Sequence, residues 1–158
     1  MNSGDEMAIL QQTYTLCSTH RDALKDALQD LDLRELTAPD LGNLSRQDRR
    51  LLDQFAYRYT RLQDDMGARL FPSVLRVLGE NIPAMSMLDR LDRMEQLGWL
   101  PAADEWADLR RIRNEFTHEY PESAIDRFER LDLALKSAHR LVEIIESVGE
   151  KIIQRFSE

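Results

Sequence analysis

The chain has 158 residues, a length typical of one domain that buries its own hydrophobic core. Apolar residues make up 42% of it and charged residues 32%, with 6 glycines and 5 prolines, which excludes a disordered chain and favours a helix-rich one. The 29 acidic residues outnumber the 21 basic ones, and a net charge of -8 repels polyanions. Any nucleic-acid site must therefore be local.

The first residues contain no basic segment followed by an apolar one, and no window of about 18 consecutive apolar residues occurs. These features predict a cytoplasmic protein that has no contact with a membrane. The single cysteine, Cys17, falls on an apolar helical stripe and cannot form an internal disulfide. We therefore expect it to be a small core residue and not a reactive thiol.

Apolar residues recur at spacings of three and four along nearly the whole chain, and no alternating strand pattern occurs, so the sequence predicts an all-α fold. The first helix is expected over residues 7–31, with one apolar stripe that only Arg21 interrupts. A loop that contains Pro39 and Gly42 is expected to follow it.

A second helix is expected to begin at Ser45, because Asp48 follows three residues later and can complete a capping pair. Its apolar stripe covers residues 52–66. Pro72 lacks a backbone N–H donor and crowds the preceding turn. The segment that reaches residue 78 is therefore either a bent continuation of this helix or a separate short one.

Residues 79–83 are expected to close this region, and Ser86 is placed to cap a short helix that ends at Leu97. Residues 98–101 form a corner, with the proline near the first position of the next helix. That helix is expected from about residue 102 to about residue 118. It ends there because Pro121 biases the residue before it away from helical geometry.

The last helix is expected from about Glu122 to Phe156, with the repeated three-four apolar spacing of a coiled-coil-like stripe. Four or five antiparallel helices joined by short corners predict an up-and-down bundle with a long C-terminal helix. We expect residues 1–158 to form a single domain.

Chemically distinctive side chains gather at the predicted end of the helix over residues 102–118: Arg113, Asn114, His118 and Tyr120. Arg113 carries a permanent charge that can stabilise negative charge on phosphorus. His118, with a reference pKa of about 6.5, can accept or deliver a proton near neutral pH. Two proton transfers and charge stabilisation suffice to cleave RNA without a metal or another cofactor.

Arg113 and His118 are five positions apart, which places them about 140° apart around an ideal helix. Asn114 and His118 are one turn apart and share a face. Arg113 and His118 can therefore grip one phosphate only if the backbone unwinds near His118, or if a second copy of the chain supplies one of them. The second route favours a two-fold homodimer.

The pattern Arg-Asn-x3-His-x-Tyr-Pro at a helix end resembles the signature of the HEPN superfamily, and its closest likeness is the HepT-like toxin branch. The order of residues 55–72, 87–100 and 105–121 is also similar to that of HepT-like proteins encoded beside small nucleotidyltransferases. These segments extend the resemblance over about two-thirds of the chain.

This resemblance implies a metal-independent endoribonuclease toxin, with Arg113 and His118 catalytic at a homodimer interface and Asn114 as the polar residue that follows the arginine. Tyr120 is implied to be the residue to which a partner nucleotidyltransferase antitoxin adds a nucleotide. A bulky anion at that position would block and repel RNA, which would neutralise the toxin. Some relatives are substrate-binding companions of nucleotidyltransferases. The alternative is therefore a non-catalytic partner that docks through Tyr120 and Arg113.

Four further arginines are candidates for binding RNA: Arg58, Arg61, Arg110 and Arg111. Tyr57 and Tyr59 lie beside the first two and can stack on unpaired bases. The alternative for all four arginines is ordinary ion pairing on the surface. Trp99 and Trp106 are expected to pack in the core and not to stack on bases.

Two acidic patterns in the sequence have spacings that could suggest a metal site. Glu115 and His118 have the Glu-x-x-His spacing of di-iron bundles, but neither His20 nor His139 has a glutamate three residues before it, so the second pair is missing. The other acidic set is Asp64, Asp65, Asp89 and Asp92. Its last two members alternate with arginines, as on an ordinary ion-paired helix face. The sequence predicts no metal site.

Overall fold

The structure is a computed structural model that describes residues 3–118 and 123–156. Its elements are α1 (Ser3–Arg34), α2 (Ala38–Gly42), α3 (Arg46–Asp65), the π-helix η1 (Met66–Leu70), α4 (Phe71–Val77), the 3-10 helix η2 (Ile82–Ala84), α5 (Met87–Gln96), α6 (Ala103–His118) and α7 (Ala124–Phe156). All of these elements are helical, so the predicted all-α class is confirmed.

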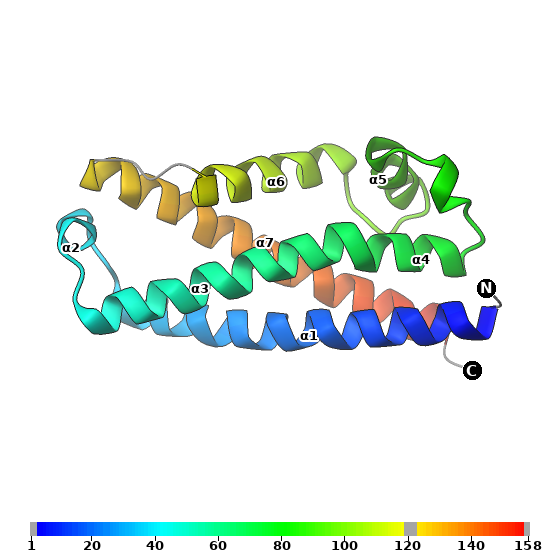
Figure 1. Cartoon of the computed structure of the whole chain (residues 1–158), viewed down its shortest axis with the longest axis horizontal. Coiled ribbons are helices and arrows are strands. Elements are labelled where there is room, and N and C mark those ends of the chain that lie inside the picture. The colour runs from blue at the N-terminus through cyan, green and yellow to red at the C-terminus, as the bar shows by residue number, and fades with distance from the viewer. Residues whose placement is uncertain (1–2, 119–122, 157–158) are drawn as a thin grey trace.

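The helices form an up-and-down bundle (Figure 1). Helix α1 runs beside the continuous rod of α3, η1 and α4, and α7 crosses both and reaches back to the end where the chain begins. Helix α6 lies over α7, and the short α5 packs against α4 and α6 at one end. The other end holds α2 and the first turns of α3 and α7.

Side-chain caps set two of the predicted helix starts. The hydroxyl of Ser45 accepts a hydrogen bond from the Asp48 N–H at 3.1 Å, and that of Ser86 accepts one from the Asp89 N–H at 3.1 Å. Each bond satisfies one of the backbone donors that a helix start leaves unpaired. The starts predicted at Ser45 and Ser86 are therefore confirmed.

The loop predicted around Pro39 is wrong, because residues 38–42 form α2. The Asp40 carboxylate accepts a hydrogen bond from the Thr37 N–H at 2.8 Å, while the Thr37 hydroxyl accepts one from the Asp40 N–H at 3.4 Å. This is a reciprocal capping box, and Pro39 occupies the first turn, where a missing N–H costs little. The two hydrogen bonds between Thr37 and Asp40 thus stabilise a helix in a segment whose proline and glycine favour a turn.

Pro72 is accommodated by a π turn, so the segment after α3 is a continuation and not a separate helix. The Phe71 N–H donates to the carbonyl of Met66, five residues back, and the chain passes from α3 through η1 into α4. A π turn includes one more residue between donor and acceptor than an α-helical turn. It thereby shifts the backbone hydrogen-bond register at the point where the pyrrolidine ring of Pro72 would crowd an α-helical turn. The Ser73 hydroxyl donates to the Arg69 carbonyl at 2.7 Å.

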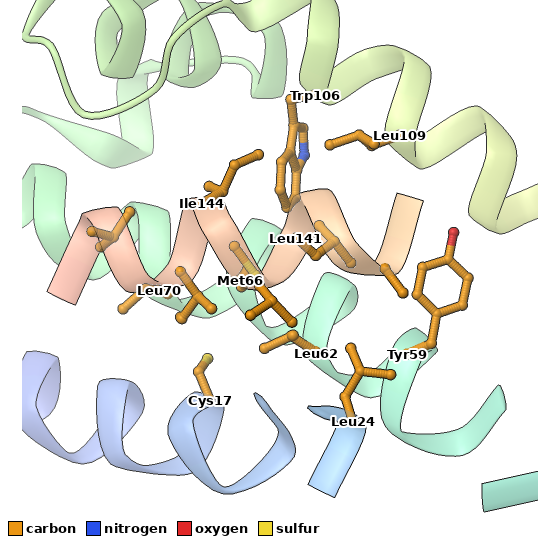
Figure 2. Close-up of a cluster of buried hydrophobic side chains, with 14 of the residues drawn as sticks. Cys17, Leu24, Tyr59, Leu62, Met66, Leu70, Trp106, Leu109, Leu141 and Ile144 are labelled. Carbon is orange, nitrogen blue, oxygen red and sulfur yellow. The ribbon is translucent and has the colours of Figure 1, made fainter. Parts of the chain in front are cut away.

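The hydrophobic core joins α1, the α3 rod, α6 and α7 (Figure 2). Cys17 lies in it, and burial raises the pKa of its thiol to about 12, so the thiol stays protonated and inert as predicted. Trp99 and Trp106 are also buried, which confirms their predicted packing role. None of the described helices combines the length and apolarity needed to span a membrane.

Candidate functional site

Helix α6 is helical through His118, the last residue described in this part of the chain. Unwinding ahead of His118 therefore does not bring the histidine to the side of Arg113, and their backbone positions stay about 140° apart around the axis. The side chain of His118 and the whole of Tyr120 lie outside the described residues. The unwinding that one of the two routes to a shared phosphate requires does not occur within residues 103–118.

Arg113 is anchored by side chains of α3 and α6. Its guanidinium donates to the Asp64 carboxylate at 2.7 Å and to the Thr117 hydroxyl at 3.1 Å, with the Asn114 amide oxygen at 3.4 Å. The Arg113 side chain is 18% exposed, whereas that of Asp64 is 50% exposed. We call Asp64, Arg113, Asn114 and Thr117 the α6-side cluster. This cluster holds the Arg113 guanidinium in a fixed position, and its Asp64 side is exposed to solvent.

Aromatic rings of α3 and α6 pack together next to this cluster in the sequence: Phe55 and Tyr59 are buried, and Phe116 is partly buried. Phe116 makes edge contacts with Phe55 and Tyr59, each with ring centroids 5.8 Å apart. The Tyr59 hydroxyl donates to Ser137 at 3.0 Å, which ties α3 to α7. Burial raises the pKa of Tyr59 to about 12, and the nearby positive charge of Arg113 opposes that rise. Tyr59 is therefore a neutral hydrogen-bonded support for Arg113 and not an acid or base.

The other two arginines of α6 lie in different surroundings. Arg111 is within 3.3 Å of Glu115 and 4.0 Å of Asp108, both on its own helix, which is the surface ion pairing considered as an alternative. Arg110 is exposed and lines a cavity of about 220 Å³ together with Asp64 and Trp106. Of the two, Arg110 is therefore the one beside the α6-side cluster.

Arg58 and Arg61 face α1 and do not join Arg113. Arg58 lies 3.0 Å from His20 Nδ1, and the Asp65 carboxylate lies 3.5 Å from His20 Nε2 and 4.0 Å from Arg61. We call His20, Arg58, Arg61 and Asp65 the α1-side cluster. The side chains of His20 and Asp65 are 5% and 9% exposed. Burial lowers the pKa of His20. The positive charges of Arg58 and Arg61 lower this pKa further, and the negative charge of Asp65 opposes the shift.

Sequence reasoning missed the α1-side cluster and the acidic partner of Arg113. The position of His20 gave one usable signal, since it follows the core residue Cys17 by three positions and so falls on the buried face. Asp64 and Arg113 are 49 positions apart, and no local spacing connects them. Among the described residues, no group of three or more histidine, cysteine or acidic side chains is arranged to hold a metal ion.

A larger cavity, also missed, lies at the end of the bundle where α6 finishes. It has a volume of about 540 Å³ and is enclosed by α2, the first turns of α3, the last turns of α6 and the first turns of α7. Phe116 and Thr117, which directly precede His118, line it. The last described turn of α6 thus lies beside this cavity.

Comparisons with family models, with curated proteins and with solved structures return no match for this chain. The resemblance to the HEPN superfamily is therefore a hypothesis that rests on the motif residues and on the order of the surrounding segments.

Proposed function

We propose that the protein is a metal-independent endoribonuclease, the cytoplasmic toxin of a HepT-like pair, acting as a homodimer. The observation that supports this most is the placement of Arg113 in the next-to-last turn of α6, with its guanidinium held by Asp64 and Thr117. A fixed guanidinium loses little further freedom on gripping a phosphate. It can therefore stabilise charge that develops on phosphorus in the transition state.

The proposed reaction needs two proton transfers. His118 accepts the proton of the ribose 2′-hydroxyl as the 2′ oxygen forms its bond to phosphorus, and the bond from phosphorus to the 5′ oxygen breaks. The departing 5′ oxygen then receives this proton from the protonated His118, which returns to its starting state. The products are a 2′,3′-cyclic phosphate and a free 5′-hydroxyl. The reaction as written requires no oxidant and no metal ion.

Hydrogen bonding around Arg113 leaves its Nε–H donor available to a substrate. Its Nε atom is buried and has no partner among the described residues, and an unpaired buried donor costs about 1–3 kcal/mol. A phosphate oxygen that enters beside Asp64 would satisfy this donor once the side chain shifts. The half-exposed Asp64 carboxylate binds Nη2 and would keep this contact while the phosphate binds at Nε.

The remaining predicted residues have supporting roles in the proposal. Asn114 orients the guanidinium through its amide oxygen, and Arg110, beside the same cavity as Asp64, contacts an RNA phosphate. Tyr120, two positions after the end of α6, is the proposed acceptor of a nucleotide from the partner nucleotidyltransferase. An added nucleotide there places negative charge beside the site and repels RNA.

An RNA cleavage assay with a chelator present tests this proposal. We expect the wild-type protein to cleave single-stranded RNA and to leave cyclic phosphate ends, and His118→Ala to abolish cleavage. His139→Ala is the matched control, because His139 is an exposed histidine on α7 away from the motif. Intact RNA with the wild type, or equal cleavage by both variants, would exclude catalysis by His118.

The alternative function is a non-catalytic docking partner of a nucleotidyltransferase. It is favoured by the 2.7 Å ion pair, since Asp64 already neutralises much of the charge of Arg113. Expression without a partner separates the two functions. A toxin arrests growth and His118→Ala relieves the arrest, whereas a docking partner is harmless and still binds the nucleotidyltransferase.

A further inference from the structure

The cavity at the end of α6 has the build of a ligand site. Its volume of about 540 Å³ lies within the range of about 300–1,000 Å³ that is usual for small-molecule sites. The apolar part of its lining is formed by Leu41, Leu44, Leu52, Ala56, Phe116 and Leu131. Such a surface suits a flat, weakly polar group such as a nucleobase.

The charged part of the lining is basic although the chain is acidic. Arg49, Arg127 and Arg130 line the cavity against a single carboxylate, that of Asp53, among the described residues. The chain as a whole carries a net charge of -8. A positively charged side chain beside an apolar cavity favours an anionic ligand, and Arg49 is the arginine that carries this argument.

Two of these arginines also shape the cavity. Arg130 donates to the Glu115 carbonyl at 2.7 Å, which ties α7 to the last turns of α6, and Arg127 donates to the Leu41 carbonyl at 3.3 Å, which ties α7 to α2. The cavity walls are thus held in place by hydrogen bonds from the groups that carry the charge.

Arg49 differs from these two arginines. Its guanidinium has no hydrogen-bond or ion-pair partner within residues 3–118 and 123–156, although its side chain lines the cavity. It lies in the first turn of α3, where the partial positive charge of the helix start adds to its own. The start of α7 lies at the same end of the bundle (Figure 1). An unpaired cation beside an apolar hollow is an attachment point for a phosphate.

We propose that this cavity binds one nucleotide of single-stranded RNA, with its base against the apolar lining and its phosphate on Arg49. Base contacts with aromatic and apolar side chains tolerate any sequence, and basic side chains track the backbone. Phe116 and Thr117 directly precede His118, so the bound nucleotide flanks the phosphate that is cut. The identification of RNA rests on the proposed function.

Binding of an uncleavable probe tests the inference without requiring catalysis. The probe is a fluorescent 2′-O-methyl hexaribonucleotide, which lacks the attacking hydroxyl, and fluorescence anisotropy reports binding. We expect Arg49→Gln to weaken binding at least fivefold and Ala56→Glu, which places a carboxylate in the cavity, to abolish it. Arg50→Gln is the matched control, because Arg50 is the next residue along α3, is exposed and does not line the cavity. It should change binding less than twofold.

The salt dependence of binding gives a second readout. Loss of one phosphate contact lowers the slope of log affinity against log salt concentration by about 0.7 for a single strand. We expect that change for Arg49→Gln and not for Arg50→Gln. Equal losses in the two variants, or wild-type binding by Ala56→Glu with its fold intact by circular dichroism, overturn the inference. So does binding of anionic phospholipid vesicles or a phosphopeptide without binding of the probe.

The nuclease proposal and the nucleotide-site proposal can fail independently of each other. If the protein binds the probe through Arg49 but leaves RNA intact, the nucleotide site is supported and the proposed nuclease function is excluded. If the protein cleaves RNA but its Arg49→Gln variant binds and cleaves like wild type, the nuclease function is supported. The cavity is then excluded as a nucleotide site.

Discussion

The two polar clusters on either side of α3 use similar residues but differ in burial. In the α1-side cluster, the side chains of His20 and Asp65 are 5% and 9% exposed. In the α6-side cluster, those of Arg113 and Asp64 are 18% and 50% exposed. A ligand can reach the Asp64–Arg113 pair without unfolding the bundle, whereas Asp65 and His20 are buried between α1 and α3. We therefore propose a structural role for the α1-side cluster and a binding role for the α6-side cluster.

The largest expected effect is on catalysis. Arg113→Ala should lower the rate of RNA cleavage by about 10²–10³-fold, the usual cost of removing one donor that stabilises transition-state charge. Arg111→Ala is the control, since Arg111 makes surface ion pairs on the same helix. Single-turnover cleavage measures both. A loss of equal size in the control would remove the distinction between the two arginines.

The next effect is on stability and concerns the α1-side cluster. Asp65→Ala should lower the free energy of unfolding by about 1–3 kcal/mol, because it removes the buried carboxylate that lies 3.5 Å from His20 Nε2 and leaves His20 without its ion-pair partner. The variant should still cleave RNA at conditions where it is folded. Urea denaturation gives the first quantity and the cleavage assay the second. A stable but inactive Asp65→Ala variant would reverse the roles assigned to the two clusters.

Asp64→Ala should behave in the opposite way. The ion pair with Arg113 is half exposed, so its loss should change the free energy of unfolding by about 1 kcal/mol or less. Cleavage should nevertheless fall by about 10–100-fold, since the guanidinium loses the contact that orients it. Asp64→Asn, which keeps an acceptor, should recover part of the rate. Faster cleavage by Asp64→Ala would identify Asp64 as an inhibitory contact.

The smallest effect is a pH dependence of stability that comes from His20. Its pKa is lowered in the folded protein by burial and by Arg58 and Arg61, so the unfolded chain binds the proton more tightly. Stability is full above a pH of about 6.5 and falls as the pH decreases toward the folded pKa. Urea midpoints at two pH values on either side of this window measure it. His20→Gln should lose less stability on acidification than wild type, and an equal loss would contradict the assignment.

The parts of this molecule that the sequence predicted are those that local chemistry determines. Ser45 and Ser86 begin their helices as expected because a cap involves residues three positions apart. Helix α2 was missed because the capping box of Thr37 outweighed the composition of the segment.

The candidate site was predicted in its residues but not in its surroundings. Arg113 and Asn114 could be named from their spacing, but the pairing of Arg113 with Asp64 depends on how α6 packs on α3. The cavity beside Phe116 arises from the packing of α2, α3, α6 and α7, and no single segment encodes it. The long-range contacts of a bundle appear only after its helices are placed.

The central claim is that one active site is built from Arg113 of one copy and His118 of another. Mixing the Arg113→Ala and His118→Ala variants, each inactive alone, tests it most directly. After subunit exchange, half of the dimers contain one intact site of two, so the mixture should recover about a quarter of wild-type cleavage. No recovery in a mixture whose subunits have exchanged would contradict a site shared between two chains.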